Sequence, residues 1–419
     1  MLSQMEASVV LSFKHHLKEE KNVHMEHMED LPFNEGVEGT RKAINFLRDL
    51  RDMLAGHSTK NLSTTVKWDG APAIFAGIDP RDGKFFVAKK GIFNKNPKIY
   101  KTQADIKADL SGELASKFSI ALEEFSKLGI TAGVYQGDLM FTKGDVKLET
   151  IEGEKFYTFH PNTIVYAVPV RSALGNTIAK AKIGVVWHTT YTGKTFETMT
   201  ASFGKGIVNK MKQVPGIWMD DATYKDYSGT ATFTQSETKE ITSILSKAGS
   251  LFQSLDAKLL NAFRDDEELL TLVKTFNNSK IRANQKVTDP RKHVEELFHY
   301  IYDKIQKEID SRKTEAGKAA QEERRKKVLA LFSSHDKAEI AKVFELTNLL
   351  VDAKHMIIDK MNQAGHINTF LKTADGFKVT GVEGFVAIDH LTGGAVKIVN
   401  RMEFSKANFS PEIIKGWQR

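Results

Sequence analysis

The chain contains no cysteine among its 419 residues. This absence excludes disulfides, thiolate catalysis, and zinc or iron–sulfur sites with cysteine ligands. The sequence also has no apolar run long enough to cross a membrane, and its first residues lack the cationic start and small-residue cleavage site of a signal peptide. We therefore expect a cytoplasmic protein that does not bind a membrane.

The charge balance is moderately basic. Lys and Arg number 60 against 53 Asp and Glu, which gives a formal net charge of +7. Such an excess favours a polyanionic partner, because Lys and Arg that neutralise phosphates release counterions. It fits equally well a basic protein that never contacts nucleic acid.

The sequence changes three times between a helix-like and a strand-like pattern of apolar residues, which predicts an α+β protein. An N-terminal helical segment (1–60), with a clear apolar stripe over 39–54, is expected to pack on a catalytic domain. Short β-rich runs alternate with turns over 61–235, and one helix ending at Gly129 interrupts them. Residues 236–365 are expected to be almost entirely helical. Strands return over 366–419, so we expect them to complete the first domain around an inserted all-α domain.

The residues with the clearest chemistry are Val66-Lys67-Trp68-Asp69-Gly70, which follow a β-like run. A lysine amine attacks phosphorus only when it is neutral, and desolvation or nearby positive charge favours that form. A lysine just past a strand, beside a glycine that permits close backbone approach, is well placed for such an attack. Read alone, the segment is also compatible with an exposed turn lysine, since Lys-x-Asp-Gly occurs by chance in many proteins.

Further segments follow in the order shared by the covalent nucleotidyltransferases, the superfamily of ATP-dependent DNA ligases, RNA ligases and mRNA-capping enzymes. KWDG resembles motif I of that superfamily. The similar later segments are Phe86–Gly91 (motif Ia), Val134–Leu139 (III), Ile183–His188 (IIIa), Glu383–Val386 (IV) and Val396–Val399 (V). The resemblance covers about 62–205 and 378–409, and it implies a ligase-type nucleotidyltransferase domain of antiparallel sheets with helices. The whole chain also resembles proteins of large tailed bacteriophages.

The resemblance implies a set of site residues. The expected catalytic residues are Lys67, Asp69 and Lys397, and Lys67 would carry the nucleotide. ATP would also contact Gly70, Lys90, Asp138, Trp187 and Glu383. Asp138 and Glu383 would hold Mg²⁺ or Mn²⁺ with water and phosphate.

Three positions depart from the superfamily pattern. Asp138 stands where motif III has Glu, Val399 stands where motif V often has a second lysine, and His188 stands where motif IIIa has an acidic residue. The alternative for Trp187, expected to stack on the base, is a core aromatic on a buried strand.

Nucleic-acid ends are the expected partner of a monomeric protein. Lys95 and Lys98 lie in a basic turn with an aromatic residue, and Arg401 could stand in for the missing motif V lysine. The turn is equally well an ordinary exposed loop. About twenty residues follow Lys397, too few for the OB-fold of DNA ligases, so we expect an RNA-ligase-like enzyme with the helical insert gripping the substrate.

A second polar cluster comprises His24, Glu26, His27, Glu29 and Asp30. Histidines three apart can share a helix face, so a divalent metal site is one interpretation. The other is a polar segment that packs on the catalytic domain and caps the following helix.

The leading hypothesis is an ATP-dependent polynucleotide ligase that joins 3′-hydroxyl and 5′-phosphate ends of RNA or DNA. One alternative is a nucleotidyltransferase, of the capping or protein-modifying type, that stops after nucleotide transfer. The other is an inactive nucleic-acid-binding phage protein that keeps the fold.

Overall fold

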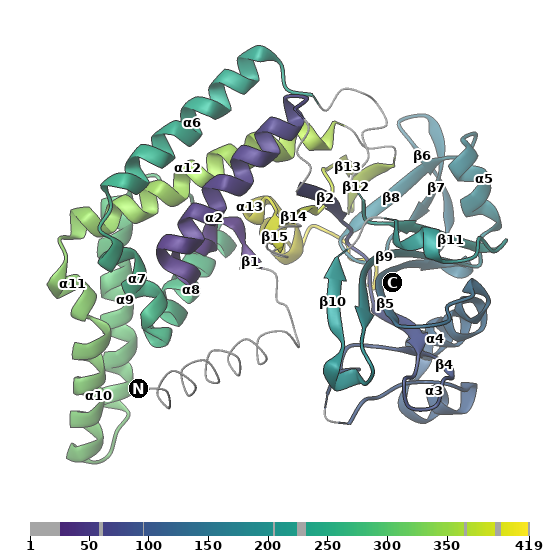
Figure 1. Cartoon of the computed structure of the whole chain (residues 1–419), viewed down its shortest axis with the longest axis horizontal. Helices are drawn as coiled ribbons and strands as arrows, with labels where there is room; N and C mark the ends of the chain where they lie inside the picture. Colours follow the sequence, from purple (N-terminus) through teal and green to yellow (C-terminus); the bar gives the residue numbers. More distant parts are fainter. Residues whose placement is uncertain are drawn as a thin grey trace, which may run out of the picture.

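The structure is a computed structural model that describes residues 26–57, 62–94, 96–203, 206–223, 232–363, 367–389 and 395–417. The chain forms a helical body and a strand-rich body (Figure 1). The expected α+β class is therefore confirmed at this coarse level. Within the described ranges, no helix is both long enough and apolar enough to span a bilayer.

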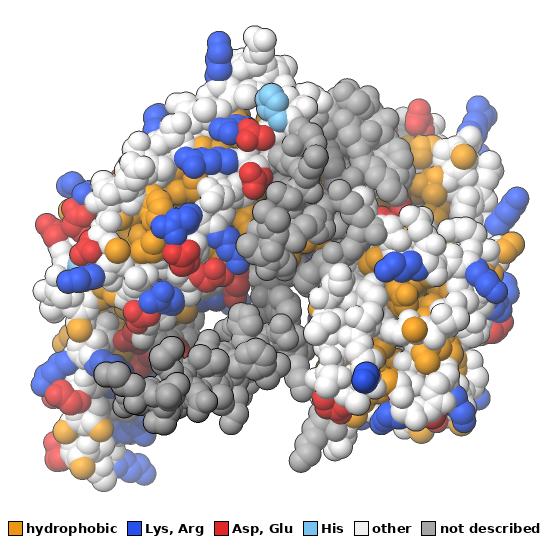
Figure 2. All heavy atoms as spheres, viewed as in Figure 1, with side chains coloured by type: hydrophobic (Ala, Val, Ile, Leu, Met, Phe, Trp, Pro, Cys, Tyr) orange, Lys and Arg blue, Asp and Glu red, His pale blue; other side chains and the backbone are white. Residues whose placement is uncertain are grey.

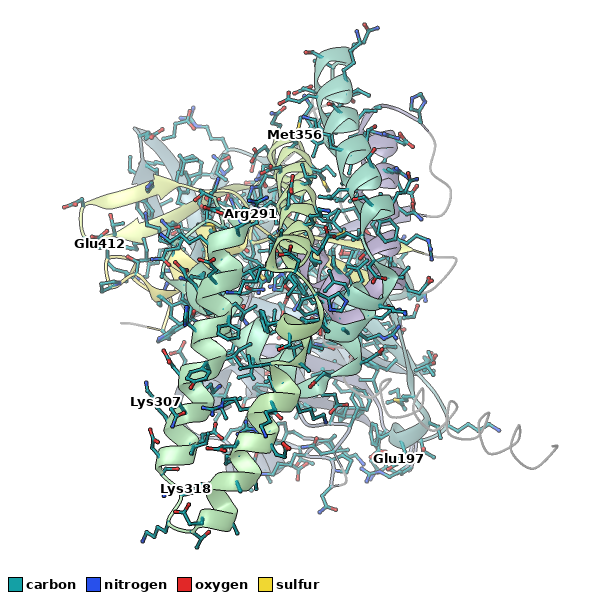
Figure 3. The ribbon with its side chains drawn as sticks, turned by 90° about the vertical axis from the view of Figure 1, so that its left-hand side faces the viewer. Glu197, Arg291, Lys307, Lys318, Met356 and Glu412 are labelled. Atoms are coloured by element: carbon teal, nitrogen blue, oxygen red, sulfur yellow. The ribbon has the colours of Figure 1, made fainter. Side chains whose placement is uncertain are left out.

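The helical body joins one helix from the N-terminal part to the run of helices after residue 234. They are α2 (Leu31–Leu54), α6 (Gln235–Ser254), α7 (Ala257–Asp265), α8 (Glu267–Arg282), α9 (Pro290–Asp310), α10 (Glu315–Val328), α11 (Ala330–Ser334) and α12 (Lys337–Asn362). Figure 3 shows α9 and α10 side by side as a projecting hairpin, with Lys318 near its tip.

The apolar stripe of α2 is buried as predicted, with Phe46, Leu47 and Leu50 in the core of the helical body. α2 lies chiefly against α6, α7 and α12, and the core that it joins also includes the strand residues Phe385 and Ala387, so the expected packing on a catalytic domain stays a prediction. The stripe matches the apolar faces of those helices and shares one core with them.

The strand-rich body contains three sheets. The first has the order β1-β15-β14-β2, the second β10-β9-β5-β3-β4 with β11 beside β9, and the third β13-β12-β8-β7-β6. The strands before the helices are β1 (Glu26–His27), β2 (Leu62–Lys67), β3 (Ala73–Ile78), β4 (Phe85–Ala88), β5 (Val134–Thr142), β6 (Lys147–Ile151), β7 (Glu154–Phe159), β8 (Ile164–Pro169), β9 (Ile183–Thr192), β10 (Thr200–Phe203) and β11 (Ile217–Asp221). Those after them are β12 (Asn368–Thr373), β13 (Gly376–Val379), β14 (Gly384–Asp389) and β15 (Ala395–Ile398).

Strands from both ends of the chain pair with one another. β14 runs antiparallel to β2, with Gly384 opposite Lys67, and β12 runs antiparallel to β8. The strands that follow the helices therefore lie in the same sheets as strands that precede them. This pairing brings residues about 320 positions apart into one site.

The first sheet has two unlike faces, because residues directly opposite each other on paired strands share a face. Phe385, Ala387, Val396 and Ile398 face the core of the helical body. Lys67 and Lys397 belong to the other face, in register with Gly384 and Val386 of β14. The helices thus cover one side and leave the lysine-bearing side free for a site.

The second sheet is covered by α4 (Gly112–Phe125), whose Phe118, Ala121 and Phe125 pack into a core with strand residues. The chain then makes a short 3-10 turn and reaches Gly129, whose φ of 70° ends the helical stretch as predicted. The remaining short elements are α3 (Gln103–Asp109), α5 (Ala173–Lys180), η1 (Met28–Asp30), η2 (Ser126–Leu128), η3 (Lys143–Asp145), η4 (Phe196–Thr198) and η5 (Ile207–Lys210).

One β-like prediction near the C-terminus is wrong. The run after Lys397 was expected to continue as strand, but α13 (Arg401–Phe409) begins directly after β15. Asn400 caps this helix, because its side chain accepts a hydrogen bond from the backbone N–H of Glu403. The helix lies between the two bodies and packs against α8.

Candidate active site

Lys67 is the last residue of β2, and its backbone position is fixed from two sides. In the turn after it, Asp69 contacts the third sheet and Gly70 contacts the second. A Cβ at Gly70 would lie 2.5 Å from the Cβ of Asp138, so only glycine fits there. The turn after Lys67 is thus held against β5, which is the strand that carries Asp138.

The carboxylate of Asp69, which we expected to be catalytic, is held by hydrogen bonds within the strand-rich body. Its carboxylate accepts hydrogen bonds from Asn162 Nδ2 at 2.6 Å and from the backbone N–H groups of Thr163 and Ile164 at 2.7 and 2.8 Å. Its own N–H donates to the Tyr166 hydroxyl at 2.7 Å. Both carboxylate oxygens are therefore occupied by the third sheet, and this anchors the turn that presents Lys67.

Glu383 pairs directly with Lys67 through Oε1 and Nζ. The next residue, Gly384, has a φ of 149°, a conformation that side chains rarely adopt, and a Cβ there would meet the Ile398 carbonyl at 2.6 Å. Glycine at this position lets β14 begin immediately opposite Lys67 and points Glu383 at its amine. Burial raises the pKa of Glu383 to about 7 despite the charge of Lys67, and Asp69 and Asp138 add to the increase.

Lys397 of β15 lies on the same face of the first sheet as Lys67. Burial lowers its pKa, and the positive charge of Lys67 lowers it further. It forms no ion pair with any carboxylate of the described residues. Its positive charge is thus directed into the site without a local counter-ion in contact.

Asp138 enters the same site from β5 of the second sheet. Burial raises its pKa to about 7, and the charges of Lys67 and Lys90 oppose the increase. Two carboxylates, Asp138 and Glu383, therefore titrate near neutral pH beside one lysine. Groups with strongly shifted pKa values in one place are typical of functional sites.

His188 is a site residue that the sequence analysis did not assign. Its Nε2 lies 3.9 Å from Asp138 Oδ2, and burial lowers its pKa to about 4, so it is neutral at pH 7. The alternation of side chains along β9 places His188 and Trp187 on opposite faces, but it does not show which of the two faces meets the site.

Trp187 does not stack on a nucleotide base, and this prediction is wrong. Its side chain is fully buried between the second sheet and α4, with its ring 5.3 Å from that of Phe125. The alternative, a core aromatic on a buried strand, is the one the structure supports. The residue at the site from this strand is its neighbour, His188.

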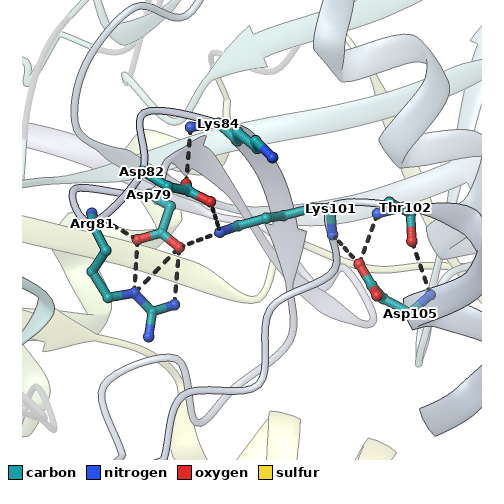
Figure 4. Close-up of polar contacts among 7 residues, drawn as sticks. All are labelled: Asp79, Arg81, Asp82, Lys84, Lys101, Thr102 and Asp105. Atoms are coloured by element: carbon teal, nitrogen blue, oxygen red, sulfur yellow. Dashed lines mark hydrogen bonds and ion pairs between the residues drawn. The ribbon is translucent and has the colours of Figure 1, made fainter.

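The expected contacts with nucleic acid are scattered. Lys95 lies outside the described residues. Lys98 is exposed and pairs with Asp109 at 2.5 Å, and Lys90 is exposed near Asp138. The end of the basic turn is held in place, because Lys101 forms ion pairs with both Asp79 and Asp82 (Figure 4).

Arg401 is not free to bind phosphate as we expected. It pairs with Asp30 at 2.8 Å and lies 3.6 Å from Glu29, and its Nη2 donates to Asn278 Oδ1 at 2.5 Å. Breaking this partly buried pair would remove the ion-pair partner of Asp30 and leave its carboxylate uncompensated. Arg401 instead holds the start of α13 against η1 and α8.

The second polar cluster is placed for packing rather than for metal binding. His24 lies outside the described residues. Glu29 pairs with buried Lys354 at 2.8 Å, and Glu26 pairs with Lys274 at 3.3 Å. His27 is neutral, because burial lowers its pKa to about 3. The capping part of that interpretation is wrong, since Asp30 at the N-cap of α2 makes no capping hydrogen bond.

A groove of about 340 Å³ opens beside the lysine pair. Lys67, Glu383 and Lys397 line one side, and Asn278 and Arg282 of α8 with Phe409 of α13 line the other. The lysine-bearing face of the first sheet therefore borders a groove whose other lining comes from the C-terminal end of α8 and from α13. The geometry can hold a phosphate-bearing ligand between Lys67, Lys397 and Arg282.

The chain belongs to a family of unknown function, DUF6267, whose members match it over residues 22–413. The match includes β2, β14, β15 and the helices between them, so the whole candidate site lies inside it. No curated protein and no solved structure matches the chain.

Proposed function

We propose that the protein is an ATP-dependent polynucleotide ligase that works through a covalent Lys67–AMP intermediate. Its strand-rich body would be a ligase-type nucleotidyltransferase domain, interrupted by the inserted helices. The observation that carries the proposal is the convergence of Lys67, Asp138, Glu383 and Lys397, which arrive from β2, β5, the turn before β14, and β15. Their order along the chain is that of motifs I, III, IV and V.

The first step forms a bond between Lys67 Nζ and the α-phosphorus of ATP and breaks the bond to the leaving pyrophosphate. Glu383 is in contact with the amine and has a pKa of about 7, so it can accept the ammonium proton near neutral pH. Lys397 and Lys90 place positive charge where negative charge grows on the transferring phosphoryl group.

A divalent cation fits the donor set of the site. Asp138 and Glu383 offer carboxylate oxygens, the ligands that Mg²⁺ prefers, and both titrate near neutral pH. Within the described ranges no group of three or more His, Asp or Glu residues is arranged to hold a metal, so water and phosphate oxygens would complete the shell. The ion would supply further positive charge at the phosphates.

Two transfers would follow. The 5′-phosphate of a polynucleotide attacks the phosphorus of Lys67–AMP, which breaks the Lys67–phosphorus bond and leaves the end activated. A 3′-hydroxyl then attacks the 5′-phosphorus, and AMP leaves as the strand is sealed. A transferase that stops after nucleotide transfer would share the labelling of Lys67 and the transfer to an acceptor, and would lack only the sealing step.

The decisive experiment is covalent labelling with α-labelled ATP and Mg²⁺. Lys67→Ala and Lys67→Arg should both abolish the label, because neither side chain is an amine nucleophile, whereas Lys127→Ala, an exposed helix-end lysine, should label normally. Retained label in Lys67→Ala would falsify the proposal. Supplying RNA, DNA and mixed ends to labelled protein then separates a ligase, which joins strands, from a transferase that releases an activated end.

A further inference from the structure

Phe409 is exposed to an extent that is unusual for a phenylalanine. It is the last residue of α13, and 66% of its surface is accessible. The guanidinium carbon of Arg282, the last residue of α8, lies 5.5 Å from the centre of its ring. The two helix ends therefore present a stacked aromatic and guanidinium pair to solvent, which packing of the core does not require.

This pair lies on the groove that leads to Lys67, on the wall formed by the helical body. Arg282 is exposed and Lys397, opposite, is half-buried; neither forms an ion pair with a carboxylate in the described part of the chain. Arg401, by contrast, is held by Asp30 and Glu29. The free positive charge of the groove thus comes from Arg282 and Lys397, while Glu383 is bound to Lys67.

The charge at this groove differs from that of the open surface. On the face shown in Figure 2, positive and negative side chains are interspersed over the helical body. In the groove, four cationic residues (Lys67, Arg282, Lys397 and Arg401) line the walls with one glutamate. Concentrated positive charge beside an aromatic ring suits a ligand that has both phosphate and a flat ring.

We infer that Arg282 and Phe409 form a stacking platform for the terminal base of the polynucleotide end that receives the nucleotide from Lys67. The inference rests on the proposed function and names its substrate class. Bases stack on aromatic rings and guanidinium planes only when they are unpaired or splayed from their neighbours. The platform therefore selects single-stranded or overhanging 5′-phosphate ends over the interior of a nicked duplex.

The groove offers polar groups that complete such a site. Asn278 of α8, together with Ser405 and Asn408 of α13, lines the groove between the platform and the lysine pair. The Asn408 amide oxygen accepts a hydrogen bond from Thr163 at 2.7 Å, next to the backbone N–H groups that hold Asp69. The platform is thereby fixed relative to Lys67 through the third sheet.

The test compares Phe409→Ala and Arg282→Gln with Trp417→Ala in the full-length protein. Trp417 is a matched control, because 64% of its surface is exposed and it does not line the groove. Labelled protein is mixed with a 5′-phosphorylated single-stranded oligonucleotide, and the rate of AMP transfer is divided by the rate of Lys67 labelling. Because one stacked base is worth roughly 1–3 kcal/mol, the ratio should fall about fivefold or more in both platform variants.

Phe409→Trp should restore the ratio, since any large aromatic ring can stack. Trp417→Ala should change it less than twofold, and the unfolding temperatures of all the variants should match the wild type. Equal transfer by Phe409→Ala and wild type, or a wild-type preference for nicked over single-stranded ends, would overturn the inference.

Failure of the proposed function has a different signature. If wild-type protein takes no label, the proposed enzyme activity is wrong. The platform is then tested directly by measuring the affinity for a fluorescent 5′-phosphorylated oligonucleotide from its anisotropy. Binding that weakens in Phe409→Ala but not in Trp417→Ala keeps the platform, and equal affinities reject it.

Discussion

The helical body and the strand-rich body each hold a lysine against a glutamate, but in opposite electrostatic settings. In the helical body Lys354 pairs with Glu29, and their side chains are 1% and 9% exposed. In the strand-rich body Lys67 pairs with Glu383, at 28% and 16% exposed. The same two residue types thus form a sealed pair in one body and an open pair beside a groove in the other.

The two glutamates differ in the net effect of their surroundings. Burial alone would raise the pKa of Glu29, but Lys354 and Arg401 outweigh it and hold the pKa at about 2. Glu383 has Lys67 for attraction and the carboxylates Asp69 and Asp138 for repulsion, so burial prevails and its pKa reaches about 7. The second cation, Arg401, helps to keep Glu29 ionised at neutral pH. The acidic neighbours of Glu383 instead bring its pKa close to neutral, so that it can gain or lose a proton there.

The largest effect should come from breaking the sealed pair. Lys354→Ala leaves Glu29 buried without its main partner, which should lower the free energy of unfolding by about 3–5 kcal/mol. Urea denaturation measures this loss. The double variant Glu29→Gln/Lys354→Met, which removes both charges, should recover most of it, and a loss below about 1 kcal/mol in Lys354→Ala would mean that the pair does not anchor the helices.

The open pair should show the reverse pattern. Glu383→Gln removes the proton acceptor while keeping the shape, so covalent labelling of Lys67 should slow by about 10²-fold, the usual contribution of a positioned base. Its free energy of unfolding should not fall at neutral pH, because burial and the nearby acids disfavour the charged form of Glu383. Glu29→Gln is the control, with lower stability and near-normal labelling of the remaining folded protein; equal labelling by Glu383→Gln and wild type would remove Glu383 from the chemistry.

The smallest effect is a difference in pH dependence. Folding raises the pKa of Glu383 from 4.5 to about 7, so the folded protein retains a proton that the unfolded chain has released. Its stabilising contribution is complete below pH 4.5 and is lost as pH rises through about 7. For Glu29, with a folded pKa of about 2, the contribution is complete above pH 4.5 and is lost as pH falls through about 2.

The measurement is the unfolding free energy of wild type minus that of each variant, between about pH 5 and pH 8. The difference should fall with pH for Glu383→Gln and stay level for Glu29→Gln. A level line for Glu383→Gln would show that its pKa is not raised in the folded protein.

The sequence was informative where a side chain's role follows from local pattern. The stripe of α2, the helix ending at Gly129, and the positions of Lys67, Glu383 and Lys397 on or beside strands all follow from periodicity and turn residues. Pattern could not tell which face of β9 meets the site, because Trp187 and His188 are adjacent and both suit a binding pocket. That choice was settled by α4, whose apolar face buries Trp187.

The long-range pairings were also beyond the reach of the sequence. Arg401 looked like a free cation, yet its partners Asp30 and Asn278 lie 371 and 123 positions away. Asp69 was expected to be catalytic within KWDG, but the backbone N–H groups of Thr163 and Ile164, just before and at the start of β8, bind its carboxylate. In both cases the deciding contact depends on how separate elements pack, which no local spacing encodes.

The pairing of β2 with β14 also has a consequence for how the protein is made. As the chain leaves the ribosome, the strand that carries Lys67 emerges more than 300 residues before Gly384, its partner. Until then β2 has an unpaired edge, and such edges readily pair with other chains. Contacts this distant in sequence also form slowly. The site would therefore be completed only after β14 has been synthesised. A nascent chain that stalls before β14 would hold Lys67 on a strand whose partner is missing.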